Sequence, residues 1–297
     1  MRWREDLLKN KPSHRTNITY LIWIVIIVFA FVCTACNGND ASQPPNLTEK
    51  SPGQNVRMLE GGPENQRRKL KPLSNRALQQ QYPDVLMLHG DTSRNQIALT
   101  FDDGPDTRYT PMILEILKKH NVKATFFLIG SRVKALPQIT RNIADEGHAI
   151  GNHTYWHPAL YEHEIGRLRW ELAETNKVFL QTIGRRPTLF RAPYGGLNTR
   201  IVEELKRAGF SVIGWDVDTL DWKHQNPEQI RDVVLGHIHP GAIILMHSAG
   251  HWTQDLTATA KALDLIIPQL KKQGLKFVTI PNMFNPKVAV LLQSQQR

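Results

Sequence analysis

Cysteine is nearly absent from this chain of 297 residues, in which Cys33 and Cys36 are the only two. Two cysteines exclude a disulfide framework and a four-cysteine zinc site. No internal repeat is evident, and the composition of 41% hydrophobic and 22% charged residues excludes a fully disordered or collagen-like chain. Histidine, by contrast, is plentiful at 12 residues. Any metal site must therefore draw on histidines and carboxylates.

Acidic residues are outnumbered by basic ones, and the formal net charge of +10 indicates an anionic partner or surface. The excess is spread unevenly along the chain. Residues 1–95 hold 13 Lys and Arg against 8 Asp and Glu, and residues 96–297 hold 24 against 19. A nucleic-acid-binding domain usually gathers its charge into a stripe, and the larger part of this chain is only mildly basic. We therefore expect no nucleic-acid partner.

The first 36 residues have the pattern of a signal or membrane-anchor segment. Basic residues precede the almost unbroken apolar run Ile18–Val32, and no charged residue occurs from Asn17 to Gly38. At about 1.5 Å per residue, such a run can just span a hydrocarbon core of ~30 Å. The basic flank predicts that the amino terminus lies in the cytoplasm. The rest of the chain is then expected outside the cytoplasmic membrane, tethered to it and facing the cell wall.

Cys36 leaves the mode of attachment open. Thr34 and Ala35 before it resemble a bacterial lipoprotein cleavage site, although Cys33 stands where leucine is usual. Lipid attachment at Cys36 and an uncleaved signal anchor are both compatible with this pattern. Residues 37–84 are rich in Asn, Gln, Pro, Gly and Ser without sustained periodicity, which indicates a flexible basic linker. We place a single folded domain at residues 85–297 and expect it to be a monomer.

From residue 95 onward, short apolar runs alternate with longer amphipathic ones. Strands are predicted near 97–101, 124–129, 148–151, 210–215, 243–247 and 277–280. Helices are predicted near 110–120, 137–146, 161–182, 199–208 and 257–273. This alternation indicates an α/β fold with a mainly parallel sheet. About seven such units in roughly two hundred residues favour a single (β/α) barrel over two domains.

Two adjacent carboxylates, Asp102 and Asp103, follow the first predicted strand. Gly104 and Pro105 then force a turn, so both acids open onto a loop at the carboxyl end of a buried strand. Catalytic residues of parallel α/β folds gather at such ends. Paired carboxylates there are costly unless they are hydrogen-bonded or bound to a metal. A turn with capping carboxylates is the structural alternative.

A histidine pair, His153 and His157, follows the strand predicted near 148–151. On a helical turn, two histidines four residues apart lie on one face and can share an ion. The pair alone is a weak signal, and it becomes stronger with a carboxylate from another strand end, namely Asp103 or Asp102. Two histidines and one carboxylate would leave an open position for water, as catalytic zinc sites do.

The chain from about residue 95 to 282 resembles the polysaccharide deacetylases with a NodB-like catalytic domain. The resemblance rests on five motifs in the family's order. They are Thr100–Pro105 (TFDDGP), His153 with His157, Arg191–Gly195 (RAPYG), Asp218–Trp222 (DTLDW) and Leu245–His247 (LMH). The resemblance implies a distorted (β/α) barrel and metal-dependent removal of acetyl groups from glycans.

The resemblance also implies roles for the residues that carry a metal ion and a base. It assigns Asp103, His153 and His157 as ligands of a divalent metal. It assigns Asp102 as the general base and Arg191 as the partner that holds the carboxylate of the base. Zinc is the metal expected, with cobalt, nickel or manganese as alternatives, because the ligand set alone does not select one.

Five further residues take roles in substrate binding and proton transfer from the same resemblance. His247 is implied as the general acid and Asp221 as the residue that orients it. The backbone N–H of Tyr194 is implied as the donor to the oxyanion. Trp222 and Leu245 are implied as apolar walls around the acetyl methyl group and the acid.

We therefore expect a metal-dependent hydrolase that removes N-acetyl groups from a polymer of N-acetylhexosamines. Its location favours peptidoglycan as the acetylated glycan substrate, followed by chitin oligomers and poly-N-acetylglucosamine. An O-acetyl esterase acting on acetylated xylan would use the same residues. A non-catalytic glycan-binding module is the alternative from another class, and the intact set Asp102, Asp103, His153, His157 and His247 argues against it.

Overall fold

The computed structural model describes residues 75–251 and 253–284. The predicted anchor segment, the linker up to residue 74 and the end of the chain from residue 285 lie outside the described residues. Within the described ranges, no helix combines the length and apolar character needed to cross a membrane. Helix α3 (Asn75–Gln81) falls in the segment predicted to be linker, and its Leu78 is buried. The folded part therefore begins no later than Asn75.

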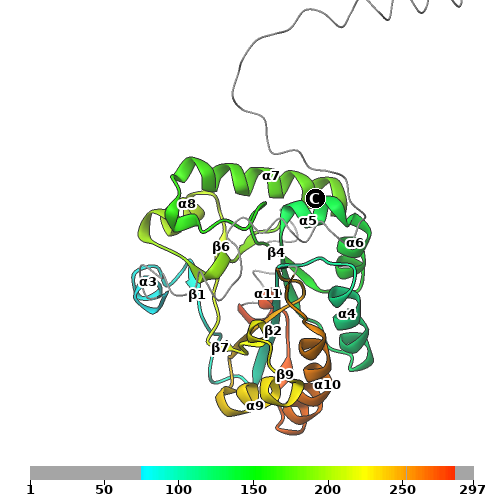
Figure 1. The fold of residues 1–297 in the computed structure, drawn as a ribbon. Coiled ribbons are helices and arrows are strands. Elements are labelled where there is room, and N and C mark those ends of the chain that lie inside the picture. The colour runs from blue at the N-terminus through cyan, green and yellow to red at the C-terminus, as the bar shows by residue number, and fades with distance from the viewer. Residues whose placement is uncertain (1–74, 252, 285–297) are drawn as a thin grey trace, which may run out of the picture. The chain divides into compact units, whose positions relative to one another are not determined.

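A curled sheet of nine strands, all paired in parallel, forms the centre of the described part (Figure 1). Its order is β1-β6-β5-β4-β3-β2-β8-β7, and β9 pairs with the beginning of β2. The strands are β1 (Leu86–Met87), β2 (Gln96–Asp102), β3 (Thr125–Leu128), β4 (Ala149–Asn152), β5 (Leu189–Phe190), β6 (Ser211–Ile213), β7 (Val217–Asp218), β8 (Ile243–His247) and β9 (Lys276–Phe277).

The predicted α/β class with a distorted barrel is confirmed, in the form of a half-barrel whose end strands are β1 and β7. The strand count differs from the prediction of about seven. Strands β1, β5, β7 and β9 have two residues each, which is too short for a hydrophobic pattern to reveal.

Helices cover the outer face of the sheet, and α4 and α10 lie side by side along it (Figure 1). The helices after α3 are α4 (Tyr109–Lys119), α5 (Gly130–Ala135), α6 (Pro137–Asp145), α7 (Ile165–Ile183), α8 (Thr199–Arg207), α9 (Pro227–His237), α10 (Thr257–Lys272) and α11 (Ile280–Phe284). Short 3-10 turns are η3 (Leu160–Glu162), η4 (Pro193–Gly195) and η5 (Asp221–Lys223). The prediction omitted α5, α9 and α11. The start of α9 carries a local signal, because Asn226 and Gln229 form a capping box around Pro227.

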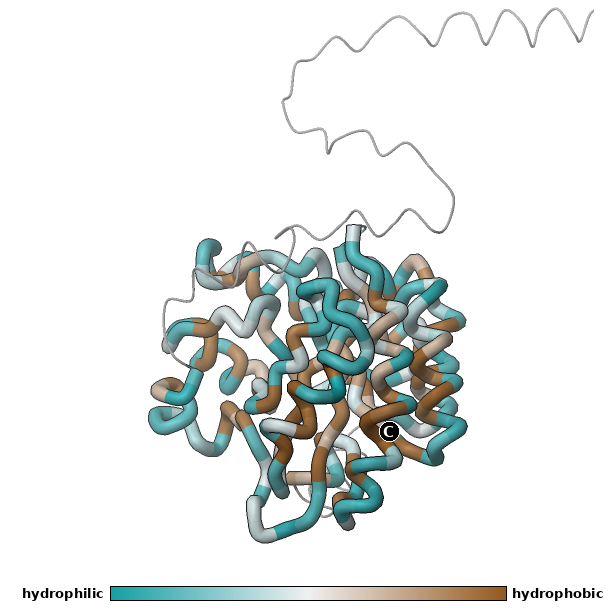
Figure 2. The backbone as a smooth tube through the Cα atoms, turned by 60° about the horizontal axis from the view of Figure 1, so that its bottom comes forward, coloured by the Kyte–Doolittle hydropathy of each residue, from teal (hydrophilic) through white to brown (hydrophobic). Residues whose placement is uncertain are grey.

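Alternate residues of strand β2 face two different parts of the core. Ile97, Leu99 and Phe101 belong to the cluster under α4 and α10, where Phe101 stacks on Phe126 with ring centroids 5.0 Å apart. Ala98 belongs to a separate cluster on the inner face of the sheet. Because side chains alternate along a strand, Thr100 and Asp102 share this inner face with Ala98. The hydrophobic strands in the middle of the molecule are visible as brown segments in Figure 2.

Strand β8 follows the same alternation. Ile244 and Met246 pack in the outer cluster, and Ile243 packs in the inner one. Leu245 and His247 therefore share the inner face with Ile243, and His247 is the register partner of Asp102 on β2. The sheet thus places one acid and one histidine on neighbouring strands, which are ~4.8 Å apart in a typical sheet.

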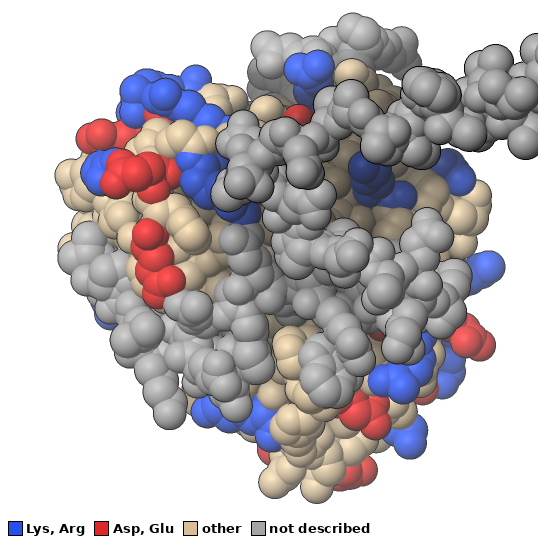
Figure 3. Space-filling model, turned by 45° about the horizontal axis from the view of Figure 1, so that its top comes forward, with Lys and Arg blue, Asp and Glu red and all other residues tan. Residues whose placement is uncertain are grey.

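The described surface carries both signs of charge. On the face in Figure 3, basic and acidic side chains lie close to one another on the described part. Several form exposed pairs, such as Arg200 with Glu164 at 3.0 Å. Exposed pairs of this kind contribute at most about 1 kcal/mol each to stability.

Candidate active site

All five sequence motifs meet at the carboxyl edge of the sheet. Asp102 ends β2, Asp218 ends β7 and His247 ends β8. His153 follows β4 directly, and Arg191 follows β5 directly. Because every strand is parallel, these ends lie on one edge, as the sequence predicted. What the sequence could not supply is the set of contacts among the side chains.

Asp103, His153 and His157 form a buried cluster with the geometry of a metal site. One ligand atom from each lies within 4.8 Å of the other two. His157 Nε2 is 3.1 Å and His153 Nε2 is 3.3 Å from Asp103 Oδ1. Asp102 lies just beside the cluster, with its Oδ2 3.7 Å from His153 Nε2.

Hydrogen bonds to the other ring nitrogens orient both histidines. His153 Nδ1 lies 2.8 Å from the carbonyl oxygen of Arg191, and His157 Nδ1 lies 2.9 Å from the hydroxyl of Tyr194. The carbonyl can only accept, so we assign the proton of His153 to Nδ1, which leaves the Nε2 lone pair directed at Asp103. Ligand histidines in proteins are typically held in this way.

The buried Oδ1 of Asp103 has no hydrogen-bond partner among the described residues. This carboxylate oxygen and the two Nε2 atoms are three acceptors whose lone pairs face the same space, with no donor between them. A divalent cation can accept lone pairs from all three atoms at once. The residues present therefore fit a metal ion.

The charges of the cluster are coupled. Burial opposes ionisation of Asp103, but His157 and His153 close by, and His247 further off, hold the pKa of this carboxyl well below its usual value. Burial likewise opposes the charged form of His153, yet Asp102 and Asp103 raise its pKa above the usual value. The carboxylate that would bind a cation is thus kept ionised.

The histidine pair does not lie on a helical turn, as the spacing argument assumed. Residues 153–157 form a loop in which Thr154 and His157 have φ of 66° and 59°. One side chain distant in sequence holds this loop. The fully buried carboxylate of Glu171, on α7, accepts from the backbone N–H groups of Tyr155 and Trp156. The two histidines thus come together as predicted, but on a loop and not on a helical turn, and their sharing of an ion stays a prediction.

Arg191 is fully buried and ties Asp102 to the inner face of the sheet. Its Nη1 donates to Asp102 Oδ1 at 2.8 Å and to Thr100 Oγ1 at 2.8 Å. Its Nε and Nη2 donate to the carbonyl oxygens of Ile213 and Gly214 at 3.1 and 2.9 Å. A buried guanidinium with this many acceptors is well compensated, and it keeps a positive charge against Asp102.

His247 is paired with Asp221 in the same buried edge. Its Nδ1 lies 2.7 Å from Asp221 Oδ1, and its backbone N–H donates to Asp221 Oδ2 at 2.9 Å. Thr259, from α10, donates to the same Oδ2 at 2.9 Å. Since the carboxylate accepts at Nδ1, Nε2 is the ring atom of His247 left to exchange a proton.

The three remaining predicted residues surround these groups. Tyr194 lies in η4 with φ of 59°, and its hydroxyl contacts His157 as described. Trp222 follows Asp221 directly in η5 and is almost fully buried. Leu245 is fully buried on the inner face of β8, two residues before His247. All ten predicted residues are therefore buried at the same edge of the sheet.

Arg132, on α5, is a buried residue that the sequence analysis did not identify. Its Nη1 donates to the backbone carbonyl of Asp103 at 2.8 Å, and its Nη2 donates to that of Gly250 at 2.7 Å. It thereby joins the loop of Asp103, whose φ is 71°, to the loop that follows His247. An arginine four residues after the end of β3 gives no local sign of this role, because both acceptors are main-chain atoms distant in sequence.

Comparison with known proteins agrees with this geometry. A family model described as polysaccharide deacetylase matches residues 89–213. The chain is 44% identical over 197 residues to a peptidoglycan-N-acetylglucosamine deacetylase of Bacillus cereus, covering 66% of this chain and 70% of the relative. It is 37% identical over 202 residues to the peptidoglycan-N-acetylmuramic acid deacetylase PdaA of Bacillus subtilis, covering 67% and 74%. The crystal structure of the Bc1960 peptidoglycan N-acetylglucosamine deacetylase superposes with a TM-score of 0.66 and 42% identity, over 69% of this chain and 95% of that one.

Proposed function

The chain belongs to the polysaccharide deacetylase family, and from that premise we propose that it hydrolyses N-acetyl groups on the aminosugars of peptidoglycan. Two relatives named for peptidoglycan deacetylation, one at N-acetylglucosamine and one at N-acetylmuramic acid, support this substrate class. The observation that carries the proposal is the convergence of three units in one buried edge. These units are the Asp103–His153–His157 cluster, the Asp102–Arg191 pair and the His247–Asp221 pair.

Asp103, His153 and His157 would hold the divalent metal ion. Such an ion, when bound, polarises the acetyl carbonyl and lowers the pKa of a water molecule from ~16 toward ~7. The hydrogen bond from His153 Nδ1–H to the carbonyl oxygen of Arg191, and the one between His157 Nδ1 and the Tyr194 hydroxyl, keep both Nε2 atoms aimed at Asp103. The chain's own contribution here is a pre-arranged and ionised ligand set.

Asp102 is proposed as the general base. Its Oδ2 lies next to His153, on the side of the metal ligands, while its Oδ1 is engaged by Arg191. The guanidinium fixes the orientation of the carboxylate, whose Oδ2 can accept a proton from the attacking water. The water oxygen forms a bond to the acetyl carbon, and the carbonyl oxygen becomes an oxyanion.

His247 is proposed as the general acid for the second half of the reaction. Asp221 fixes its ring and stabilises the imidazolium form, which holds a proton at Nε2. When the bond between the acetyl carbon and the nitrogen breaks, the nitrogen takes that proton and leaves as a free amine. Acetate is the other product.

Tyr194, Trp222 and Leu245 are proposed to complete the substrate site. The backbone N–H of Tyr194 would donate to the oxyanion, a contact worth roughly 3 kcal/mol in comparable sites. Trp222 and Leu245 would form the apolar wall around the acetyl methyl group and around His247. Their burial at the carboxyl edge supports that assignment.

We further propose that the enzyme acts outside the cytoplasmic membrane and is tethered to it by its first 36 residues. The apolar run Ile18–Val32 and the peptidoglycan substrates of the relatives support this location. Fractionation of cells into soluble, membrane and culture-fluid fractions, with and without deletion of residues 2–36, tests it.

Acetate release from a panel of glycans tests the proposed activity. The full chain should release acetate from peptidoglycan and from oligomers of N-acetylglucosamine, and a chelator should abolish the release until zinc is restored. Acetylated xylan serves as the parallel substrate for ester hydrolysis. Faster release from xylan than from every N-acetylated glycan would refute the amidase assignment, and metal binding without any acetate release would refute the enzymatic one.

A further inference from the structure

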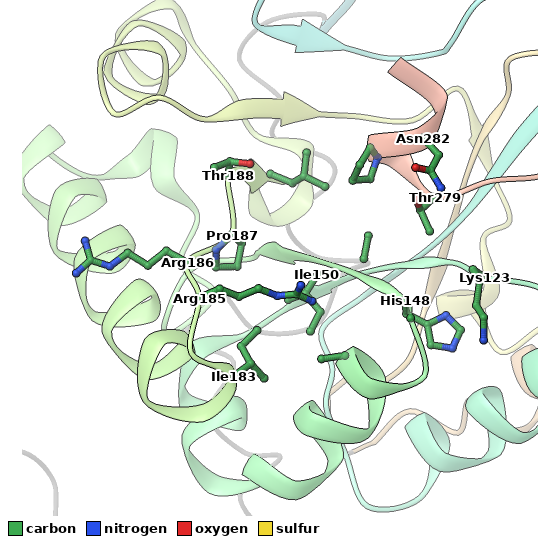
Figure 4. A pocket seen from close by; sticks show the side chains of 15 residues that line it. Lys123, His148, Ile150, Ile183, Arg185, Arg186, Pro187, Thr188, Thr279 and Asn282 are labelled. Carbon is green, nitrogen blue, oxygen red and sulfur yellow. The ribbon is translucent and has the colours of Figure 1, made fainter. Parts of the chain in front are cut away.

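A pocket lies at the opposite edge of the sheet from the candidate active site (Figure 4). Its volume is about 280 Å³, close to the lower end of small-ligand sites, ~300–1,000 Å³. The walls include residues at the beginnings of β4 and β5, the residue Lys123 before β3, and part of α11. Since the strands are parallel, this amino-terminal edge is separated from Asp102 and His247 by the length of the strands.

Every Lys, Arg, Asp or Glu among the described residues that line this pocket is a cation: Lys123, Arg185 and Arg186. Arg185 is half-buried, and no carboxylate in the described part of the chain is paired with Arg185 or with Lys123. In Figure 4, Arg185 extends along the pocket toward Ile150, Lys123 lies at the other end, and Arg186 points away. The pocket thus has one cation at each end, Arg185 near Ile150 and Lys123 beside the ring of His148.

His148 lies beside Lys123 in the pocket wall and adds no charge to the pocket. Burial and the positive charge of Lys123 lower its pKa to about 4, so it is uncharged near neutral pH. Glu146 is an acidic side chain close to it, with its Oε2 3.9 Å from His148 Nε2, and Glu146 is not among the lining residues. The pocket itself is therefore positively charged, with Thr188 and Asn282 as neutral hydrogen-bonding groups.

We propose that this pocket binds a phosphate group at Arg185, with Lys123 adding positive charge from the other end of the pocket. The forked donors of arginine match phosphate oxygens, and lysine binds phosphate as a point charge. The hydroxyl of Thr188 and the amide of Asn282 supply the remaining polar contacts from the wall between them. Free phosphate and a phosphodiester polymer of the cell wall offer the same group. The second source would give the enzyme a binding site for the wall that is separate from its active site.

Equilibrium dialysis of radiolabelled inorganic phosphate against the full chain in detergent tests this proposal. A chelator is present throughout, so that phosphate cannot bind a metal ion in the active site. We expect one saturable site, weakened about tenfold or more by Arg185→Gln and severalfold by Lys123→Gln. Arg186→Gln is the matched control, because it removes the same charge from the adjacent residue, and it should change the dissociation constant by less than about twofold.

Competition then distinguishes the two sources of phosphate. Displacement of the label by a glycerol-phosphate oligomer at lower phosphate concentration than by inorganic phosphate identifies the polymer, and the reverse order identifies a free anion. No saturable binding above that in chloride of equal ionic strength would overturn the proposal, as would equal weakening by Arg185→Gln and Arg186→Gln. Acetate release does not enter this measurement, so its outcome is independent of the proposed deacetylation.

Discussion

Asp221→Asn is the substitution that most directly separates orientation of His247 from simple burial. Asp221 accepts three hydrogen bonds, from His247 Nδ1 at 2.7 Å, from the His247 backbone N–H at 2.9 Å and from Thr259 Oγ1 at 2.9 Å. Asparagine keeps the shape of the side chain but exchanges one acceptor oxygen for an NH₂ donor. At least one N–H group of His247 must then lose its acceptor.

The size of the effect follows from which contact is lost. If the new NH₂ group faces the ring, His247 must present an unprotonated Nδ1, and Nε2 then holds its proton in a neutral ring that is a much weaker acid. The same exchange in a His–Asp pair of another hydrolase costs about 10⁴ in kcat. We expect a loss between about 10²-fold and 10⁴-fold here. A buried donor without a partner should also lower the free energy of unfolding by about 1–3 kcal/mol.

Acetate release over a range of pH is the measurement, with metal content and unfolding free energy determined on the same sample. Asp218→Asn is the matched control, because Asp218 lies in the same motif and accepts from the backbone N–H of Leu220 at 3.1 Å. We expect the control to stay within a few-fold of the unaltered chain. An Asp221→Asn enzyme that is folded, loaded with metal and nearly as fast as the unaltered chain would refute the assigned role of Asp221.

Four further substitutions have defined outcomes. Asp102→Asn should retain metal affinity and lower acetate release about 10²–10⁴-fold, because it removes the base and none of the three clustered ligands. Tyr194→Phe keeps the backbone N–H but removes the hydroxyl beside His157 Nδ1, so metal affinity in a dye-competition assay should fall about 10- to 100-fold. Arg132→Met leaves two buried backbone carbonyls without their donors and should lower the free energy of unfolding in urea by about 2–4 kcal/mol. His148 has a pKa of about 4 in the folded chain against an ordinary 6.5, so the unfolded chain binds the proton more readily. Stability should therefore decrease as the pH falls from 6.5 toward 4, and His148→Gln should remove that part of the slope.

The contradicting outcomes are equally specific. Normal turnover in Asp102→Asn would exclude Asp102 as the base. Unchanged metal affinity in Tyr194→Phe would show that the Tyr194 hydroxyl does not orient His157. An Arg132→Met chain as stable as the unaltered one would mean that other donors replace both bonds. A His148→Gln chain with the same dependence of stability on pH would assign that slope to other groups.

The alternation of strands and helices could be predicted from the sequence because it depends on local patterns. Buried strands such as β2 and β8 read as apolar runs, and α4 and α10 read as amphipathic stretches with helical spacing. Asp102, Asp103, His153 and His157 could also be predicted, because a parallel sheet carries polar residues that follow its strands to one edge. The other six candidate residues were implied only by the resemblance to the polysaccharide deacetylases. Strands of two residues and the loop conformation around His157 have no such local pattern, and both were missed or misread.

The sequence by itself thus determined the fold class, the edge where the site lies and the identity of the polar residues gathered there. Only the tertiary structure decided which atoms are in contact. Arg191 donates a hydrogen bond to Asp102, and Asp221 accepts hydrogen bonds from the ring and the backbone N–H of His247. Arg132 donates to the backbone carbonyls of two separate loops. The physical reason is the separation in sequence between the interacting residues. Secondary structure and strand-end position follow from neighbours along the chain, whereas these hydrogen bonds join residues from about 25 to 120 positions apart, which only the closed fold brings within 3 Å.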